Sequence, residues 1–246
     1  MAISTNSIIH YTDSFEKLKS ILIEGFAIKY CSEKLVIDDE NLSAAAHPMI
    51  SFCDIPLSQS FLHFEAYGKY GIGLSKNWAN KLGINPVLYL DKQSSITKTL
   101  GDFLKERRSK SSNLTVEQRN KILRIKCFTK NYSGPLKRKN VDIADYKFYD
   151  EREWRLVPES KDLNGAKFSI HMKDYEKDKK KYNDSIARIR YKFSPKDISY
   201  IIVEKTSEIP KIIKVLRDNY SNKCKVVEFD ILFSKICSTK QIVEDY

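Results

Sequence analysis

A short apolar strand followed at once by an amphipathic helix is the clearest pattern near the start of the sequence. Residues 8–11 read Ile-Ile-His-Tyr, which is typical of a buried strand. Asp13 and Glu16 have the spacing of a capping box, and apolar side chains then recur at helical intervals up to Leu22. Gly25 is well placed to end this helix in a left-handed turn. The pattern predicts a compact strand–helix unit.

Similar patterns along the chain predict a sheet with helices packed against it. Strands are expected over residues 49–53, 70–74, 87–90, 153–157 and 200–203. Helices are expected over residues 57–67, 77–82, 96–125 (with a break near 110–113) and 210–220. Residues 31–47 are polar and are expected to form a loop that can include a short helix. A further strand is expected over residues 125–129, and a charged helix or loop over residues 173–183.

The C-terminal third adds two expectations about topology. Residues 186–193 alternate between apolar and basic side chains and form the clearest predicted strand of the chain. The strand over 200–203, the helix over 210–220 and a strand expected over 225–229 predict a parallel pair joined by a right-handed crossover. We therefore predict a single α+β domain over residues 1–246, with a mixed, mostly antiparallel sheet and flanking helices.

Composition excludes several classes of protein. The 246 residues are 41% hydrophobic and 30% charged, which is ordinary for a globular chain and excludes a long disordered or fibrous one. No apolar run reaches the length of about 18 residues that a membrane-spanning helix needs. The first residues lack the basic and apolar regions of a secretory signal, and five scattered cysteines without a CxxC pair are typical of reduced thiols. These features predict a cytoplasmic protein without a membrane partner.

The positive charge is concentrated in one segment. Residues 96–139 carry 13 basic and 3 acidic side chains, so they hold +10 of the net charge of +11. We predict a basic, mainly helical insertion here that attracts nucleic acid, a phosphorylated ligand or a partner protein. The candidate contact residues are Arg107, Arg108, Lys110, Lys137, Arg138 and Lys139. The alternative is an ordinary solvated surface, and the few aromatic residues of the segment make no evident base-stacking platform.

Two places in the sequence carry residues suited to chemistry. His10 lies in the first strand, and Thr12 leads from it into the cap of a helix, where an anionic or phosphorylated ligand can be held. Glu151, Glu153 and Arg155 would share one face of a strand. The carboxylates would then divide acid, base and electrostatic roles, while the arginine pairs with one of them. The alternatives are a packed core histidine and a strand edge laced with salt bridges.

Other mechanisms lack their sequence signatures. The remaining histidines share no metal-ligand spacing, so no metal site is expected. Neither a Rossmann nor a P-loop glycine motif occurs, and there is no GxSxG. Cys53 lies in an apolar run, which favours a small core residue over a thiol nucleophile.

Several segments, taken in order and spacing, resemble a known family. The most specific strings are FCDIPLS at residues 52–58 and FYDEREWR at residues 148–155, with shorter matches in 9–26, 67–74 and 85–90. Over about residues 8–160 the chain resembles the AbiGi-type abortive-infection proteins. The resemblance implies a bacterial phage-defence protein, of a kind often described as the antitoxin-like partner in a toxin–antitoxin pair. It therefore implies a cognate toxin or antitoxin as partner.

A second, looser resemblance concerns mechanism. The order of a strand histidine, a helix, a serine-bearing strand and a late strand glutamate is similar to that of ADP-ribosyltransferases and RNA phosphotransferases. That resemblance implies NAD as the bound nucleotide and an ADP-ribosyltransferase-like fold. His10 would hold the NAD ribose, Glu153 would stabilise the oxocarbenium-like transition state and Glu151 would orient the nucleophile. The residues implied to line the NAD site are His10, Thr12, Ser51 and Tyr70.

The sequence therefore supports two alternative functions. One is a phage-defence protein with a NAD-dependent, ADP-ribosyltransferase-like site, which requires that the strands of His10 and Glu153 lie side by side around one pocket. The other is a non-catalytic antitoxin or sensor module that binds a partner toxin or nucleic acid through residues 96–139. The lack of a recognisable helix-turn-helix or aromatic sheet platform argues against direct nucleic-acid recognition.

Overall fold

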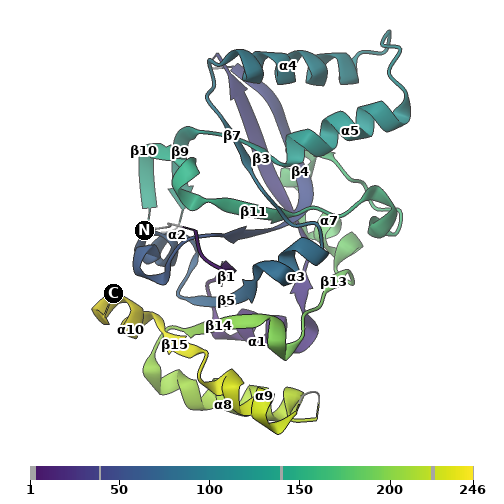
Figure 1. Cartoon of the computed structure of the whole chain (residues 1–246). Coiled ribbons are helices and arrows are strands. Elements are labelled where there is room, and N and C mark those ends of the chain that lie inside the picture. The colour runs from purple at the N-terminus through teal and green to yellow at the C-terminus, as the bar shows by residue number, and fades with distance from the viewer. Residues whose placement is uncertain (1–3, 39, 139–140, 223–224, 246) are drawn as a thin grey trace.

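A nine-stranded mixed sheet forms the centre of the protein (Figure 1). The computed structural model describes residues 4–38, 40–138, 141–222 and 225–245. Seven strands follow one another across the sheet in the order β15 (Ile236–Ser238), β14 (Ile198–Val203), β5 (Tyr70–Ser75), β1 (Ser7–Thr12), β4 (Glu40–Cys53), β11 (Glu153–Leu156) and β6 (Asn85–Pro86). Two more strands, β3 (Lys29–Ile37) and β12 (Ile170–His171), pair with β4. Only the β14–β15 pair of this sheet is parallel in the described residues, which confirms the predicted α+β class.

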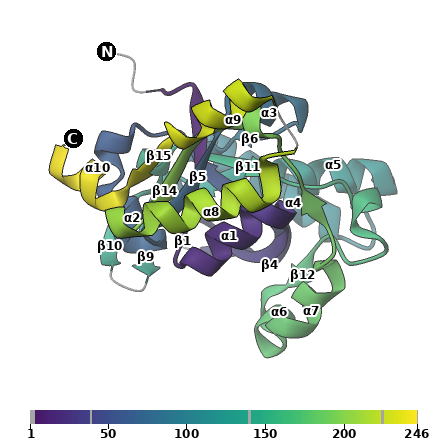
Figure 2. The ribbon, with the colours of Figure 1, turned by 90° about the horizontal axis from the view of Figure 1, so that it is seen from below.

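Helices cover both faces of the sheet (Figures 1 and 2). On one face, α1 (Phe15–Glu24) packs against α8 (Ile209–Tyr220) over the larger hydrophobic core, which includes Ile8, Leu18, Ile72, Ile201 and Leu216. On the other face, α2 (Phe61–Tyr67) and α10 (Thr239–Asp245) cover a smaller core that includes Ile9, Tyr11, Cys53, Phe64 and Ile242. Because side chains alternate along β1, successive residues of this strand serve the two cores in turn.

The predicted N-terminal strand–helix unit is present, with a different cap. Ser14, not Asp13, is the N-cap of α1, and its hydroxyl accepts a hydrogen bond from the Lys17 amide. Asp13 instead forms a surface ion pair with Lys17. Gly25 ends the helix as predicted, at a φ of 87°. A Cβ there would lie 2.7 Å from the main-chain oxygen of Tyr191, so this close approach needs glycine.

The loop expected over residues 31–47 is wrong, because this segment is a long β-hairpin. Strand β3 pairs antiparallel with β4 from Lys29 opposite Met49 to Ile37 opposite Glu40. Its polar residues misled the prediction, since one side of an antiparallel hairpin can face water. Leu35 on the other side is buried and packs under α4 (Ser95–Arg108), and Tyr30, on the same side as the exposed Ser32 and Lys34, is buried as well.

Three predicted strands near helix ends are also wrong. Residues 186–193 begin inside α7 (Lys179–Ile186), and only β13 (Arg190–Tyr191) pairs there, with the two-residue β2 (Phe26–Ala27). Residues 225–229 lie largely in α9 (Val226–Phe233), so β15 is the strand that returns parallel to β14. Residues 125–129 mostly continue α5 (Val116–Cys127) before β8 (Thr129–Asn131) begins. Apolar alternation over a few residues did not distinguish a strand from a helix end.

The basic segment forms a helical arm followed by a hairpin (Figure 1). The predicted break separates α4 from α5, and Arg119 closes the turn by donating to the main-chain oxygens of Leu114, Ser109 and Ser112 at 3.1–3.2 Å. The chain then passes through β8, which pairs with β7 (Leu88–Leu90), into β9 (Ser133–Arg138) and β10 (Val141–Lys147).

Short elements complete the described chain. They are α3 (Lys76–Lys81), α6 (Met172–Lys177) and the 3-10 helices η1 (Leu57–Gln59), η2 (Phe148–Glu151), η3 (Ser160–Leu163), η4 (Pro195–Asp197) and η5 (Thr206–Glu208). Among the described helices, none has the length and apolar character required to cross a bilayer.

Candidate functional site: a buried charge network beside a cavity

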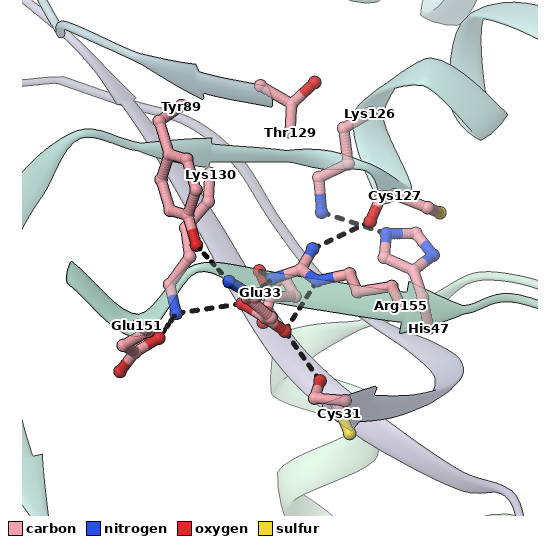
Figure 3. Close-up of polar contacts among 12 residues, drawn as sticks. Cys31, Glu33, His47, Tyr89, Lys126, Cys127, Thr129, Lys130, Glu151 and Arg155 are labelled. Carbon is pink, nitrogen blue, oxygen red and sulfur yellow. Dashed lines mark hydrogen bonds and ion pairs between the residues drawn. The ribbon is translucent and has the colours of Figure 1, made fainter. Parts of the chain in front are cut away.

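Arg155 lies fully buried at the centre of a network of charged side chains (Figure 3). Its Nε donates to Glu153 Oε1 at 2.8 Å, and its Nη2 donates to Glu33 Oε2 at 2.9 Å and to Glu153 Oε2 at 3.1 Å. Nη1 donates to the main-chain oxygen of Cys127 at 2.7 Å. A buried guanidinium is tolerated only when it is paired and hydrogen-bonded in this way. The predicted pairing of Arg155 with a neighbouring glutamate is confirmed.

Glu153 accepts hydrogen bonds at both carboxylate oxygens. Besides Arg155, Ser51 Oγ donates to Oε1 at 2.6 Å and Lys130 Nζ donates to Oε2 at 3.1 Å. Burial alone would raise the pKa of Glu153, but the charges of Arg155 and Lys130 and these hydrogen bonds outweigh it and hold the pKa well below its ordinary value. Glu153 is therefore an ionised carboxylate held in a fixed orientation.

Glu151 belongs to the same charge network, but not from the strand position that was predicted for it. It ends η2 and does not share a strand face with Glu153, because Arg152 between them adopts a left-handed φ of 44°. Tyr67 donates its hydroxyl to Glu151 Oε1, and Lys130 Nζ lies 2.6 Å from Glu151 Oε2. Lys130 therefore bridges the two carboxylates. Burial opposes its charge, but Glu153 and Glu151 raise its pKa, so the ammonium stays protonated.

His10 approaches this group from β1. Its Nδ1 lies 2.9 Å from the main-chain oxygen of Ser51. A carbonyl oxygen only accepts hydrogen bonds, so Nδ1 carries the hydrogen in this contact. Burial lowers the pKa of His10, which favours the neutral ring and leaves the lone pair of Nε2 available as an acceptor.

The strands of His10 and Glu153 are not neighbours, contrary to the prediction, because β4 lies between them. Strand β4 pairs with β1 at Ile9 opposite Cys53 and with β11 at Ser51 opposite Arg155. Ser51 consequently contacts both partners, His10 through its main chain and Glu153 through its side chain. One strand thus links the imidazole to the carboxylate.

A cavity of about 450 Å³ opens beside these residues, within the usual size of a small-molecule site. Its polar lining includes His10, Ser51, Glu33, Glu151, Glu153 and Lys130. Its aromatic lining comprises Tyr11, Tyr30, Tyr67, Tyr175, Phe52 and His63.

Two exposed cationic residues, Arg138 and Lys179, lie at the mouth of the cavity. The Arg138 guanidinium lies 5.5 Å from the centre of the Tyr67 ring, and Lys179 Nζ lies 5.9 Å from that of Tyr175. The arrangement offers an acidic floor, aromatic walls and a cationic rim.

Two residues expected at the site lie elsewhere. Thr12 is buried at the end of β1 and does not line the cavity. Tyr70 donates its hydroxyl to Glu208 Oε1 at 3.0 Å, beside the start of α8, and is also absent from the cavity lining. The order of segments along the chain could not locate Tyr70, because which end of a strand faces a cavity depends on sheet register.

The predicted basic contact residues do not form one surface (Figures 1 and 2). Arg107, Arg108 and Lys110 lie where α4 turns toward α5, and Arg107 uses its Nε to donate to the main-chain oxygen of Arg119 at 2.9 Å. Lys137 and Arg138 lie on β9, where Lys137 pairs with Asp142 and Arg138 belongs to the cavity. Lys139 lies outside the described residues.

Three residues of the network escaped sequence reasoning. Glu33 lies in the segment that was expected to be a loop, so a correct strand assignment would have drawn attention to it. Lys130 and Tyr67 come from β8 and α2, far from Glu151 and Glu153 in the sequence. No local pattern marks them, because their role comes from tertiary contacts alone.

Two comparisons with known proteins find matches that cover most of the chain. Residues 24–204 match the family model described as "Putative abortive phage resistance protein AbiGi, antitoxin". The chain is also 31% identical over 238 residues to "Abortive phage resistance protein AbiGi" of Lactococcus lactis subsp. cremoris, covering 87% of this chain and 95% of that protein. No solved structure matches the chain.

Proposed function

The chain belongs to the AbiGi family of abortive phage resistance proteins, and from this premise we propose that it is a phage-defence protein that binds NAD in its cavity and transfers ADP-ribose from it. The observation that supports this proposal is the convergence of His10, Ser51, Glu151 and Glu153 on one cavity. These residues come from three strands and a 3-10 helix and are joined by hydrogen bonds and by the Lys130 bridge.

The cavity lining suits the two chemically different parts of NAD. Arg138 and Lys179 form no ion pair within the described residues, so both cations are available to a pyrophosphate at the cavity mouth. Tyr30, Tyr67 and Tyr175 offer ring faces and hydroxyls to the nucleotide bases and riboses. The acidic floor then receives the positively charged nicotinamide ring and its ribose.

The residues of the floor have distinct tasks in this proposal. His10 accepts a hydrogen bond from a ribose hydroxyl at Nε2, and Glu153 provides negative charge beside the ribose carbon on which positive charge develops. In the transfer, the bond between the nicotinamide nitrogen and ribose C1′ breaks, and its electron pair leaves on nicotinamide. C1′ then bonds to an oxygen or nitrogen of the acceptor, whose proton passes to solvent. Ser51 and Arg155 keep Glu153 oriented throughout.

Two measurements test this function. Isothermal titration of the purified chain with NAD should show binding, and incubation with NAD and bacterial lysate should release nicotinamide. Glu153→Gln should keep binding but lower nicotinamide release by about 100-fold, because one positioned charge is removed. Glu106→Gln, at an exposed position of α4, is the matched control and should behave as the wild type. Absence of both NAD binding and nicotinamide release would overturn the proposal.

A second candidate is the antitoxin role that the description of the family model names. The arm of α4 and α5 favours it, because Ile96, Phe103 and Val116 are exposed there among basic side chains. Binding to the product of an adjacent toxin gene, followed by size-exclusion chromatography at several salt concentrations, tests this role. Arg108→Glu with Lys110→Glu should abolish such a complex, whereas His10→Gln should leave it intact. The opposite pattern would assign the partner surface to the cavity.

A further inference from the structure

Lys130 places a positive charge in the wall of the cavity that is proposed to receive a positively charged ring. Its ammonium lies 2.6 Å from Glu151 Oε2, 3.1 Å from Glu153 Oε2 and 4.5 Å from the centre of the Phe148 ring. The side chain is only 17% exposed, and the residue forms part of the cavity wall. The two carboxylates also line the cavity and would otherwise receive a ligand cation.

We infer that Lys130 is an internal competitor for the positively charged nicotinamide ring and thereby determines which form of the dinucleotide the cavity prefers. This inference rests on the proposed function and deepens it. While Lys130 bridges Glu151 and Glu153, its charge and that of Arg155 together balance the two carboxylates, so an incoming cation gains little from them. A neutral ring of the same shape meets no such competition. Lys130 therefore lowers the affinity for oxidised NAD relative to reduced NADH.

Three further residues hold the carboxylates in place when Lys130 moves. Ser51 and Arg155 still donate to Glu153, and Tyr67 still donates to Glu151. The fixed carboxylates therefore remain available to a ligand cation after the ammonium has left them. The long, flexible side chain of Lys130 starts from the middle residue of the three-residue strand β8 and can make this movement by changing its own rotamers, without rebuilding the sheet.

Binding of NAD and NADH to variants of Lys130 tests the inference. Lys130→Met should tighten binding of NAD by at least about tenfold while leaving NADH within about threefold, because only the former carries the ring charge. Lys130→Arg keeps a cation and should retain the wild-type ratio of the two dissociation constants. Lys179→Met removes a cation from the mouth and should weaken both dinucleotides alike. Thermal unfolding identifies any variant that fails to fold. If Lys130→Met fails to fold, the double variant Lys130→Met with Glu151→Gln is measured in its place, because it leaves the net charge of the site unchanged.

The outcomes separate the two proposals. An unchanged ratio of NAD to NADH affinity in Lys130→Met would overturn the inference and leave NAD binding intact. Failure of both dinucleotides to bind the wild type and every Lys130 variant would overturn the proposed function, and the inference with it.

Discussion

Lys126 Nζ lies 3.0 Å from His47 Nε2, and both side chains are buried beside Arg155 of the charge network (Figure 3). Burial lowers the pKa of Lys126, and burial together with the charge of Lys126 lowers the pKa of His47 to about 3. The imidazole is therefore neutral and accepts from the lysine, which gives the ammonium a hydrogen-bond partner between the helix α5 and the hairpin strand β4.

The pKa of His47 predicts that acid destabilises the protein before its carboxylates titrate. The unfolded chain binds a proton at His47 below about pH 6.5, whereas the folded chain does so only near pH 3. The contribution of His47 to the free energy of unfolding is therefore complete above pH 6.5 and is lost as the pH falls below that value. For His47 alone the loss between pH 7 and 5 is about 2 kcal/mol. Urea unfolding at both pH values measures it, and His47→Gln should reduce the loss. His171→Gln, at an exposed position, should not.

Arg155 is predicted to be the most sensitive charged residue of the fold. Arg155→Met leaves Glu153 and Glu33 without their main partner and should lower the free energy of unfolding by about 3–5 kcal/mol. Arg190→Met, which removes a pair with Glu24 at the surface, should cost less than about 1 kcal/mol. Chemical denaturation of the two variants measures the difference. Equal losses would show that the network contributes no more than a surface pair.

Gly68 should tolerate no side chain, whereas Gly83 should accept one at a lower cost in stability. Gly68 ends α2 at a φ of 118°, and a Cβ there would lie 2.4 Å from the main-chain oxygen of Thr12. Gly83 has a φ of 64°, and a Cβ there would meet nothing within 4 Å. Gly68→Ala should therefore cost at least about 2 kcal/mol more than Gly83→Ala in urea unfolding. Similar costs for the two variants would contradict the close packing of α2 on β1.

Arg119 should control the order of the helical arm more than the stability of the whole chain. Arg119→Met removes the donors to Ser109, Ser112 and Leu114, so the turn between α4 and α5 loses its closure. Hydrogen exchange should become faster over residues 107–119, while the global free energy of unfolding falls by only about 1 kcal/mol. Lys121→Met, at an exposed position two residues further along α5, is the control. Unchanged exchange in Arg119→Met would refute this role.

The sequence indicated several residues of the site, but not the hydrogen bonds and ion pairs that connect them. His10 and the Glu151–Glu153 pair stood out as ionisable residues beside strand patterns, and both places line the cavity. The bridge through Lys130 and the separation of β1 from β11 by β4 could not be anticipated. The positions of Tyr70 and Arg138 likewise depend on which strands pair and in which register, and those pairings join residues far apart in the chain.

By itself the sequence determined the family, the α+β class and the elements whose patterns are strong and local, such as β1, α1, β5 and α8. Capping residues, glycines and apolar periodicity act within a few residues, so they can be recognised without knowing the fold. Only the tertiary structure decided that residues 31–47 extend as a hairpin and that residues 225–229 are helical. It also decided which cations meet Glu151 and Glu153, because burial and ion pairing depend on segments that approach one another only when the sheet has assembled.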